Sequence, residues 1–201
     1  MALAAARKIV AKEGLRGLTT RRIADKIGYS AGTLYQLFAD LDDLIVHLNG
    51  RTLDALFAAC KDVGFAAGTE DALHNLANIY IRFVGENPKL WAAVVEHNPQ
   101  QGKGTPAWYS ERIRSLLALA ERALSPAYSP DDTERKNRDA HILWAGLYGI
   151  ASLETARKLP SNVTAQELVR TLVTTYVAGL RAAAGARSDD EPHSATSAQD
   201  G

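Results

Sequence analysis

The fold is decided by the stretch from Leu18 to Phe38, which reads Leu-Thr-Thr-Arg-Arg-Ile-Ala-Asp-Lys-Ile-Gly-Tyr-Ser-Ala-Gly-Thr-Leu-Tyr-Gln-Leu-Phe. We interpret it as two short helices joined by a tight turn. Thr19 and Ser30 are N-cap candidates, because a hydroxyl can accept a hydrogen bond from an open N–H group of the first turn. Gly28 ends the first helix, where a positive φ costs little. Apolar residues recur at helical spacing in both helices, namely Ile23, Ala24, Ile27, Leu34, Leu37 and Phe38.

Two helices of about two turns each cannot bury their apolar faces alone, so they need a third helix. Residues 1–13 supply it, with apolar side chains on one side and Gly14 as its end. The pattern predicts a three-helix helix-turn-helix unit, whose second short helix is shaped to enter a DNA major groove.

Working outward from this stretch, the fixed spacings of its residues resemble the N-terminal domain of the tetracycline-repressor family. The resemblance covers about the first fifth of the chain, and the alternative is an ordinary small helical bundle that contains a helix-turn-helix. It is carried by Ala6, Gly14, Leu18, Thr19, Thr20, Ile23, Ala24, Ile27, Gly28, Ser30, Gly32, Thr33, Leu34, Tyr35, Phe38 and Leu44.

The composition favours a helical protein with a sizeable core. Of the 201 residues, 46% are apolar, and the chain is rich in Ala and Leu without alternating runs of strand length. The single cysteine, Cys60, permits no internal disulfide and suits a reducing compartment. No segment has the length of a membrane span and no secretory signal is evident, so we expect a soluble cytoplasmic protein.

Charge is unevenly distributed along the chain. The net formal charge is zero, but residues 1–39 hold seven basic and two acidic side chains, so this part carries +5 and the remainder −5. A basic N-terminal module on an acidic body is the electrostatic pattern expected of a specific DNA-binding protein.

The rest of the chain predicts six further helices, which makes nine in an all-α fold. A long helix from Asp40 should pass from the DNA-binding unit into the body. The expected domains are a helix-turn-helix domain at 1–47, a ligand-binding and dimerisation domain at 48–184, and a disordered tail at 185–201. The run from Trp144 to Gly149 resembles the Trp-His-Gly class of C-terminal domains in the family, although Tyr148 stands where that class has His.

The resemblance implies that Thr20, Thr33 and Tyr35 contact the DNA backbone. From its residue type, Gln36 is the best candidate for reading a base edge, since its amide can bond adenine bidentately. Leu41 stands where the family usually has a Lys, which predicts modest affinity with a strong salt dependence. The complete set of predicted DNA-binding residues is Thr19, Thr20, Arg21, Arg22, Ser30, Ala31, Gly32, Thr33, Tyr35 and Gln36.

Large flat side chains gather in the body, and a bundle rich in them often leaves a cavity for a small apolar or aromatic ligand. Predicted ligand-binding residues are Phe57, Cys60, Tyr80, Phe83, Trp91, His97, Trp108, Ile113, Trp144 and Tyr148, and Asn78 is a further polar candidate. His141 is expected to face solvent or a dimer interface. The five histidines have no metal-ligand spacing, so we expect neither a metal nor another cofactor.

A single helix-turn-helix reads too few bases to be selective, so a homodimer on a palindromic operator in double-stranded DNA is expected. The last two helices are apolar beyond what one covering layer needs; the alternative is that these faces close the core of the monomer. Interface candidates are Ile142, Ile150, Leu153, Leu172, Tyr176 and Leu180.

The sequence therefore predicts a ligand-responsive transcriptional regulator, in first place a repressor released from DNA by an effector. The alternatives are a transcriptional activator, or a constitutive DNA-binding or architectural protein without an effector. An enzyme is not supported, because no paired carboxylates, nucleophile–base pair or phosphate-binding loop stands out.

Overall fold

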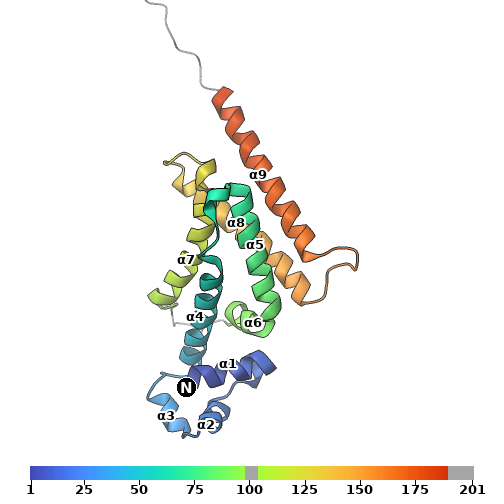
Figure 1. Cartoon of the computed structure of the whole chain (residues 1–201). Helices are drawn as coiled ribbons and strands as arrows, with labels where there is room; N and C mark the ends of the chain where they lie inside the picture. The colour runs from blue at the N-terminus through green and yellow to red at the C-terminus, as the bar shows by residue number, and fades with distance from the viewer. Residues whose placement is uncertain (98–103, 190–201) are drawn as a thin grey trace, which may run out of the picture.

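The computed structural model describes residues 1–97 and 104–189, and all regular structure within them is helical (Figure 1). The predicted all-α fold is confirmed for these residues. The α-helices are α1 (Ala2–Glu13), α2 (Thr20–Ile27), α3 (Ala31–Tyr35), α4 (Leu41–Cys60), α5 (Thr69–Glu86), α6 (Pro88–Glu96), α7 (Ala107–Leu124), α8 (Thr133–Thr155) and α9 (Ala165–Asp189). None of the described helices is long and apolar enough to cross a membrane.

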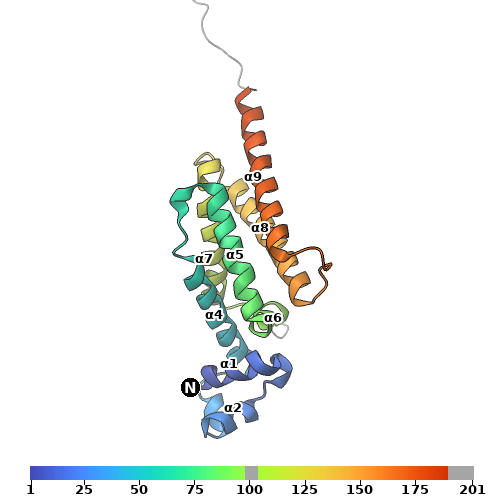
Figure 2. The same cartoon turned by 45° about the vertical axis from the view of Figure 1, so that its right-hand side comes forward.

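Helices α1 to α3 form a small unit at one end of the molecule (Figures 1 and 2). Its core contains fully buried residues from α1 and α2, such as Val10 and Ile23, and closes over Leu34 of α3. Leu90 and Ala93 of α6 belong to the same apolar cluster. The DNA-binding unit therefore completes its core with a helix of the body.

Helix α4 leaves this unit and enters the body (Figure 1). Its start is fixed by Asp40, whose side chain accepts from the Asp43 N–H at 2.8 Å, while Asp43 accepts from the Ala39 N–H at 3.0 Å. As expected, α4 spans both parts of the molecule, because Leu44 packs in the N-terminal cluster and Leu56 in the body core.

Gly50 lies in the middle of α4. A Cβ added there would lie 2.7 Å from Cζ3 of Trp108 on α7. The glycine thus allows close packing of α4 against α7.

In the body, α5 contacts α4, α7, α8 and α9, and α8 and α9 pack beside each other on one side (Figure 2). Two predicted helix ends were wrong. Helix α3 ends at Tyr35, so Leu37, which we expected to continue the helical spacing, lies beyond the helix and is 65% exposed. Helix α9 continues to Asp189, five residues into the segment we assigned to the disordered tail, and the rest of that tail lies outside the described residues.

Candidate DNA-binding surface and ligand cavity

The helix-turn-helix is built from local signals in its own sequence. The Thr19 hydroxyl accepts from the Arg22 N–H at 3.2 Å at the start of α2, and the Ser30 hydroxyl accepts from the Thr33 N–H at 3.3 Å at the start of α3. Between them Gly28 adopts φ +74°, a left-handed conformation that closes the turn. These three residues set the geometry of the two short helices.

The predicted DNA-binding residues lie on the surface of this unit. Thr20 and Thr33 are half-buried, and the exposed members of the set are Thr19, Arg21, Arg22, Ser30, Ala31, Gly32, Tyr35 and Gln36. Gln36 follows the last residue of α3 rather than lying within the helix. Sequence reasoning missed Tyr29, a 53% exposed aromatic residue in the turn. The sequence feature that could have pointed to Tyr29 is its position directly before the N-cap residue Ser30.

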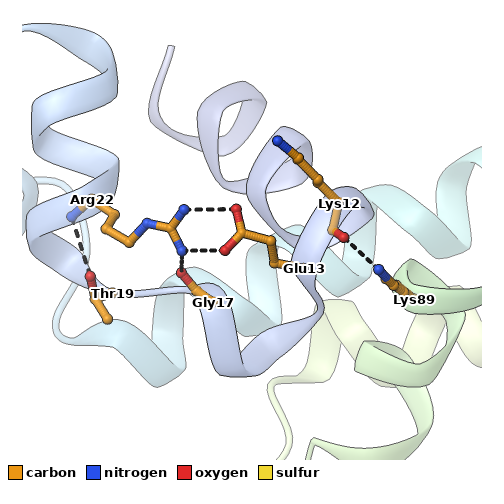
Figure 3. A network of polar contacts seen from close by, with 6 residues as sticks. All are labelled: Lys12, Glu13, Gly17, Thr19, Arg22 and Lys89. Carbon is orange, nitrogen blue, oxygen red and sulfur yellow. Dashed lines mark hydrogen bonds and ion pairs between the residues drawn. The ribbon is translucent and has the colours of Figure 1, made fainter.

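Arg22 is held by residues of its own chain (Figure 3). Its guanidinium donates to both carboxylate oxygens of Glu13, at 2.6 and 2.7 Å, and to the carbonyl of Gly17 at 2.7 Å. The hydrogen bond from Arg22 holds the pKa of Glu13 below its ordinary value of 4.5. We predicted that Arg22 binds DNA, which stays a prediction, and in the structure Arg22 joins α2 to the end of α1.

This double role can be separated by two substitutions. Glu13→Gln removes a negative charge, so electrostatics alone predicts tighter DNA binding. If Arg22 positions α2, we expect Glu13→Gln to weaken binding to every DNA sequence, as Arg22→Gln does. Fluorescence anisotropy on upstream and scrambled DNA measures these affinities.

The same ion pair predicts a pH dependence of stability. Because folding lowers the Glu13 pKa, the contact between Glu13 and Arg22 stabilises the unit above pH 4.5. This stabilisation is lost as the pH falls through the lower pKa of the folded state.

The matched control is Arg21→Gln, which removes the same charge from the neighbouring exposed position. Tighter DNA binding by Glu13→Gln, together with equal losses for the two arginine variants, would contradict the positioning role of Arg22.

The body encloses a cavity of about 580 Å³ between α4, α5, α6, α7 and α8, a size typical of small-molecule sites. Its walls are mainly aliphatic and aromatic. Seven of the ten predicted ligand-binding residues line it, namely Cys60, Tyr80, Trp91, His97, Ile113, Trp144 and Tyr148. Trp144 and Tyr148 stack on each other with ring centroids 6.1 Å apart.

The other three predicted ligand-binding residues do not line the cavity. Phe57 packs half-buried against the body core. Phe83 contacts Trp91 edge-on, with centroids 6.4 Å apart, and is absent from the lining. Trp108 packs over Gly50 and stacks on His47 at 4.9 Å. Large aromatic side chains here serve packing as often as they line the site.

Polar residues also differ from expectation. Asn78 is exposed in a shallow surface depression with Asp62 and Arg82, away from the main cavity. His141, expected at solvent or an interface, is exposed and also lines the cavity. Asn49 of α4 was missed, although a buried polar residue inside an apolar helical run was a usable signal.

Four buried polar atoms on the lining have no hydrogen-bond partner within the described residues: Asn49 Oδ1, the Tyr80 hydroxyl, Trp91 Nε1 and His97 Nε2. Burial also raises the pKa of Tyr80, and that of the Cys60 thiol to about 11, so both groups are neutral at physiological pH. Unpaired buried polar groups are uncommon in native proteins, and their concentration on one lining makes this cavity the candidate binding site.

Helix α6 touches both the cavity and the DNA-binding unit. Trp91 and Val94 line the cavity, whereas Leu90 and Ala93 pack in the N-terminal cluster. The Lys89 ammonium donates to the Lys12 carbonyl at the end of α1 (Figure 3). Nε2 of His97, at the end of α6, lies 3.9 Å from the Asp42 carboxylate in the first turn of α4.

The predicted interface residues divide into two groups. Ile142 and Leu153 are 48% and 42% exposed on α8, while Ile150, Leu172 and Tyr176 are half-buried. The prediction that Leu180 lies at the interface was wrong, because its side chain is already buried in the core of one chain. Its spacing on α9 did not distinguish the core face from the outer face.

With this geometry described, comparison with known proteins assigns the class. Residues 2–48 match the domain described as bacterial regulatory proteins, tetR family, and residues 73–176 match the tetracyclin repressor-like C-terminal domain. The chain therefore belongs to the TetR family and is a DNA-binding transcriptional regulator, not an enzyme. The particular Trp-His-Gly class of C-terminal domain stays a prediction.

Curated relatives include the regulator BetI of Rhizobium meliloti, 27% identical over 158 residues that cover 76% of each chain. The repressor KstR2 of Mycobacterium tuberculosis is 36% identical over 71 residues, which cover 35% of this chain and 34% of the relative. A TetR transcriptional regulator from Rhodococcus sp. RHA1 has the same fold, with 18% identity, a TM-score of 0.67, and coverage of 88% and 93%.

Proposed function

We propose that this regulator is a cytoplasmic homodimeric repressor that binds a palindromic operator when empty and is released by a small apolar or aromatic effector. The observation that carries the proposal is the position of α6. Adjacent residues of this helix, Leu90 and Trp91, pack respectively against the DNA-binding unit and along the cavity. A molecule that displaces α6 or the cavity wall of α4 therefore acts on the unit that holds α3.

An effector shifts the equilibrium only by its difference in affinity for the DNA-binding and released states. Asn49 of α4 donates from Nδ2 to the Ala93 carbonyl of α6 at 2.8 Å. Both helices that reach the DNA-binding unit are thus bonded to each other at the cavity wall. This contact supports a coupled movement of α4 and α6.

The dimer is supported by an apolar face on α8. Ile142, Gly149 and Leu153 lie close to one line along the helix, and space is open around Gly149. On α9, space is open around Gly179, whereas Leu172, seven positions earlier, packs over Gly146 of α8 in the same chain. Packing with a second copy would form a four-helix bundle of the kind common in dimeric helical proteins.

The test measures DNA affinity by fluorescence anisotropy on the DNA upstream of the gene, with and without compounds that raise the melting temperature. Compounds bound in the cavity are identified by a change in Trp fluorescence that is lost in Tyr80→Phe or Trp91→Phe. We expect such compounds to lower operator affinity. Cavity binders that leave DNA affinity unchanged would favour the constitutive alternative, and tighter DNA binding would favour an activator or a corepressor-dependent repressor.

A further inference from the structure

The four unpartnered polar atoms belong to side chains that are deeply buried. Asn49 is 1% exposed, Tyr80 6% and Trp91 7%, and the His97 side chain is 9% exposed. Leaving a buried polar group without a partner costs free energy, because the group gives up its hydrogen bonds to water. A molecule that pairs with these atoms recovers this cost, so the donors and acceptors among them describe the ligand.

The orientation of Asn49 is set by its neighbour. Its Nδ2 donates to the Ala93 carbonyl, which fixes the amide and leaves Oδ1 as the unpartnered atom. An amide oxygen only accepts hydrogen bonds. The ligand therefore needs a donor, such as a hydroxyl or an N–H group, at this wall.

Trp91 requires the opposite kind of group on the ligand. Its indole Nε1–H only donates, and it is unpartnered. The Trp91 ring meets the Tyr80 ring edge-on with centroids 5.4 Å apart. Trp91 lies close enough to lower the pKa of Tyr80 against the larger effect of burial, but neither the Tyr80 hydroxyl nor Trp91 Nε1 makes a hydrogen bond of normal geometry within the described residues. The ligand therefore also needs an acceptor, such as a carbonyl oxygen, near these two residues. The Tyr80 hydroxyl and the His97 imidazole can donate or accept, so they restrict the ligand less.

Charge restricts the ligand further. Among the described residues, the lining includes no Asp, Glu, Lys or Arg side chain. Taking an ionised carboxylate or ammonium group out of water without a counter-charge is strongly unfavourable.

We propose that the cavity binds an uncharged, largely apolar molecule that carries both a hydrogen-bond acceptor and a hydrogen-bond donor, of the hydroxy-ketone or hydroxy-amide class. Trp91 Nε1–H donates to its carbonyl and Asn49 Oδ1 accepts from its hydroxyl or N–H. This inference rests on the proposed function in assuming that the cavity receives an effector.

The test compares probes that share one naphthalene frame, with binding measured by isothermal titration calorimetry on the full chain without DNA. The probes are a hydroxynaphthyl methyl ketone, the ketone without the hydroxyl, an ethylnaphthol without the ketone, and a hydroxynaphthoate. Since one net hydrogen bond is worth about 1 kcal/mol, loss of either polar group should weaken binding by about fivefold. The hydroxynaphthoate should bind more weakly than the hydroxy-ketone at neutral pH.

Variants then assign the polar groups. Trp91→Phe should weaken the two ketones by about fivefold and leave the ethylnaphthol unchanged, whereas Asn49→Leu should weaken only the hydroxyl-bearing probes. Tyr109→Phe is the matched control, because Tyr109 also lines the cavity but its hydroxyl is not among the unpartnered atoms. This variant should leave the affinity for the ketones and for the ethylnaphthol unchanged. Melting curves establish that each variant is folded, and Tyr80→Phe replaces Trp91→Phe if the latter does not fold.

The proposal is overturned if the hydroxynaphthoate binds as tightly as the hydroxy-ketone, if all probes bind alike, or if none binds up to its solubility limit. Failure of the proposed function has a different signature. A hydroxy-ketone that binds as expected without changing operator affinity would leave the ligand class intact and reject the effector role. A hydroxynaphthoate that binds the protein and releases it from DNA would reject the uncharged ligand class and leave the effector role intact.

Discussion

Replacing Ile142 with Asp is expected to convert the proposed dimer into monomers and to weaken operator binding by roughly 100-fold or more, because linked half-sites gain about 10²–10⁴ in avidity. Ile142 is 48% exposed and lies three turns from Leu153 on the same face of α8, which is 42% exposed. A carboxylate buried there against a second copy would have no counter-charge. Sedimentation velocity measures the oligomeric state, and anisotropy measures affinity for palindromic DNA.

Two comparisons make this result specific. Ala58→Asp adds the same charge at an exposed position of α4 and should leave the dimer and its affinity unchanged. Binding to DNA with a single half-site should be equal for Ile142→Asp and the parent protein, because the helix-turn-helix is untouched. A variant that stays dimeric with full operator affinity would move the interface away from this face of α8.

The DNA-binding unit was the part best predicted from sequence because its signals are local. Thr19, Gly28 and Ser30 each act on a backbone group within four residues, so their effect does not depend on distant packing. Leu37 shows the limit of this reasoning. It continues the apolar spacing of α3, but the helix ends two residues before it and the side chain is exposed.

The cavity was predicted in kind but not in detail. Aromatic composition indicated that one existed, yet Trp108 and Trp91 have the same residue type and pack in different places. Leu90 and Trp91 are neighbours on a nine-residue helix and belong to different apolar clusters. A periodic pattern gives the angle of a side chain about its helix, and the arrangement of α1, α4, α5 and α7 decides what that side chain meets.

The second large effect is expected for Ile23→Ala in α2. Ile23 is fully buried in the N-terminal cluster, and truncation of a buried Ile to Ala typically costs 2–5 kcal/mol. A three-helix unit of this size has little stability in reserve, so we expect operator binding to be lost while the body stays folded and dimeric. Calorimetric melting measures the stability of the unit, and hydrogen exchange of the α2 amides measures its local unfolding.

Leu37→Ala is the control, because Leu37 lies in the same unit but is exposed, and it should change the free energy of unfolding by less than about 0.5 kcal/mol.

The melting curve of Ile23→Ala also tests how tightly the two parts are joined. Helix α4 contributes Leu48 to the N-terminal cluster and Leu53 to the body core, and Leu90 of α6 packs in the N-terminal cluster. We expect an early transition of the N-terminal unit followed by an unshifted transition of the body, because α4 and α6 remain held by the body core. A single transition shifted as a whole would instead mean that the two clusters unfold as one. A cavity ligand would then stabilise the DNA-binding unit as much as the body, and release from DNA would require movement of α4 and α6 as rigid bodies rather than local loosening of α1 to α3.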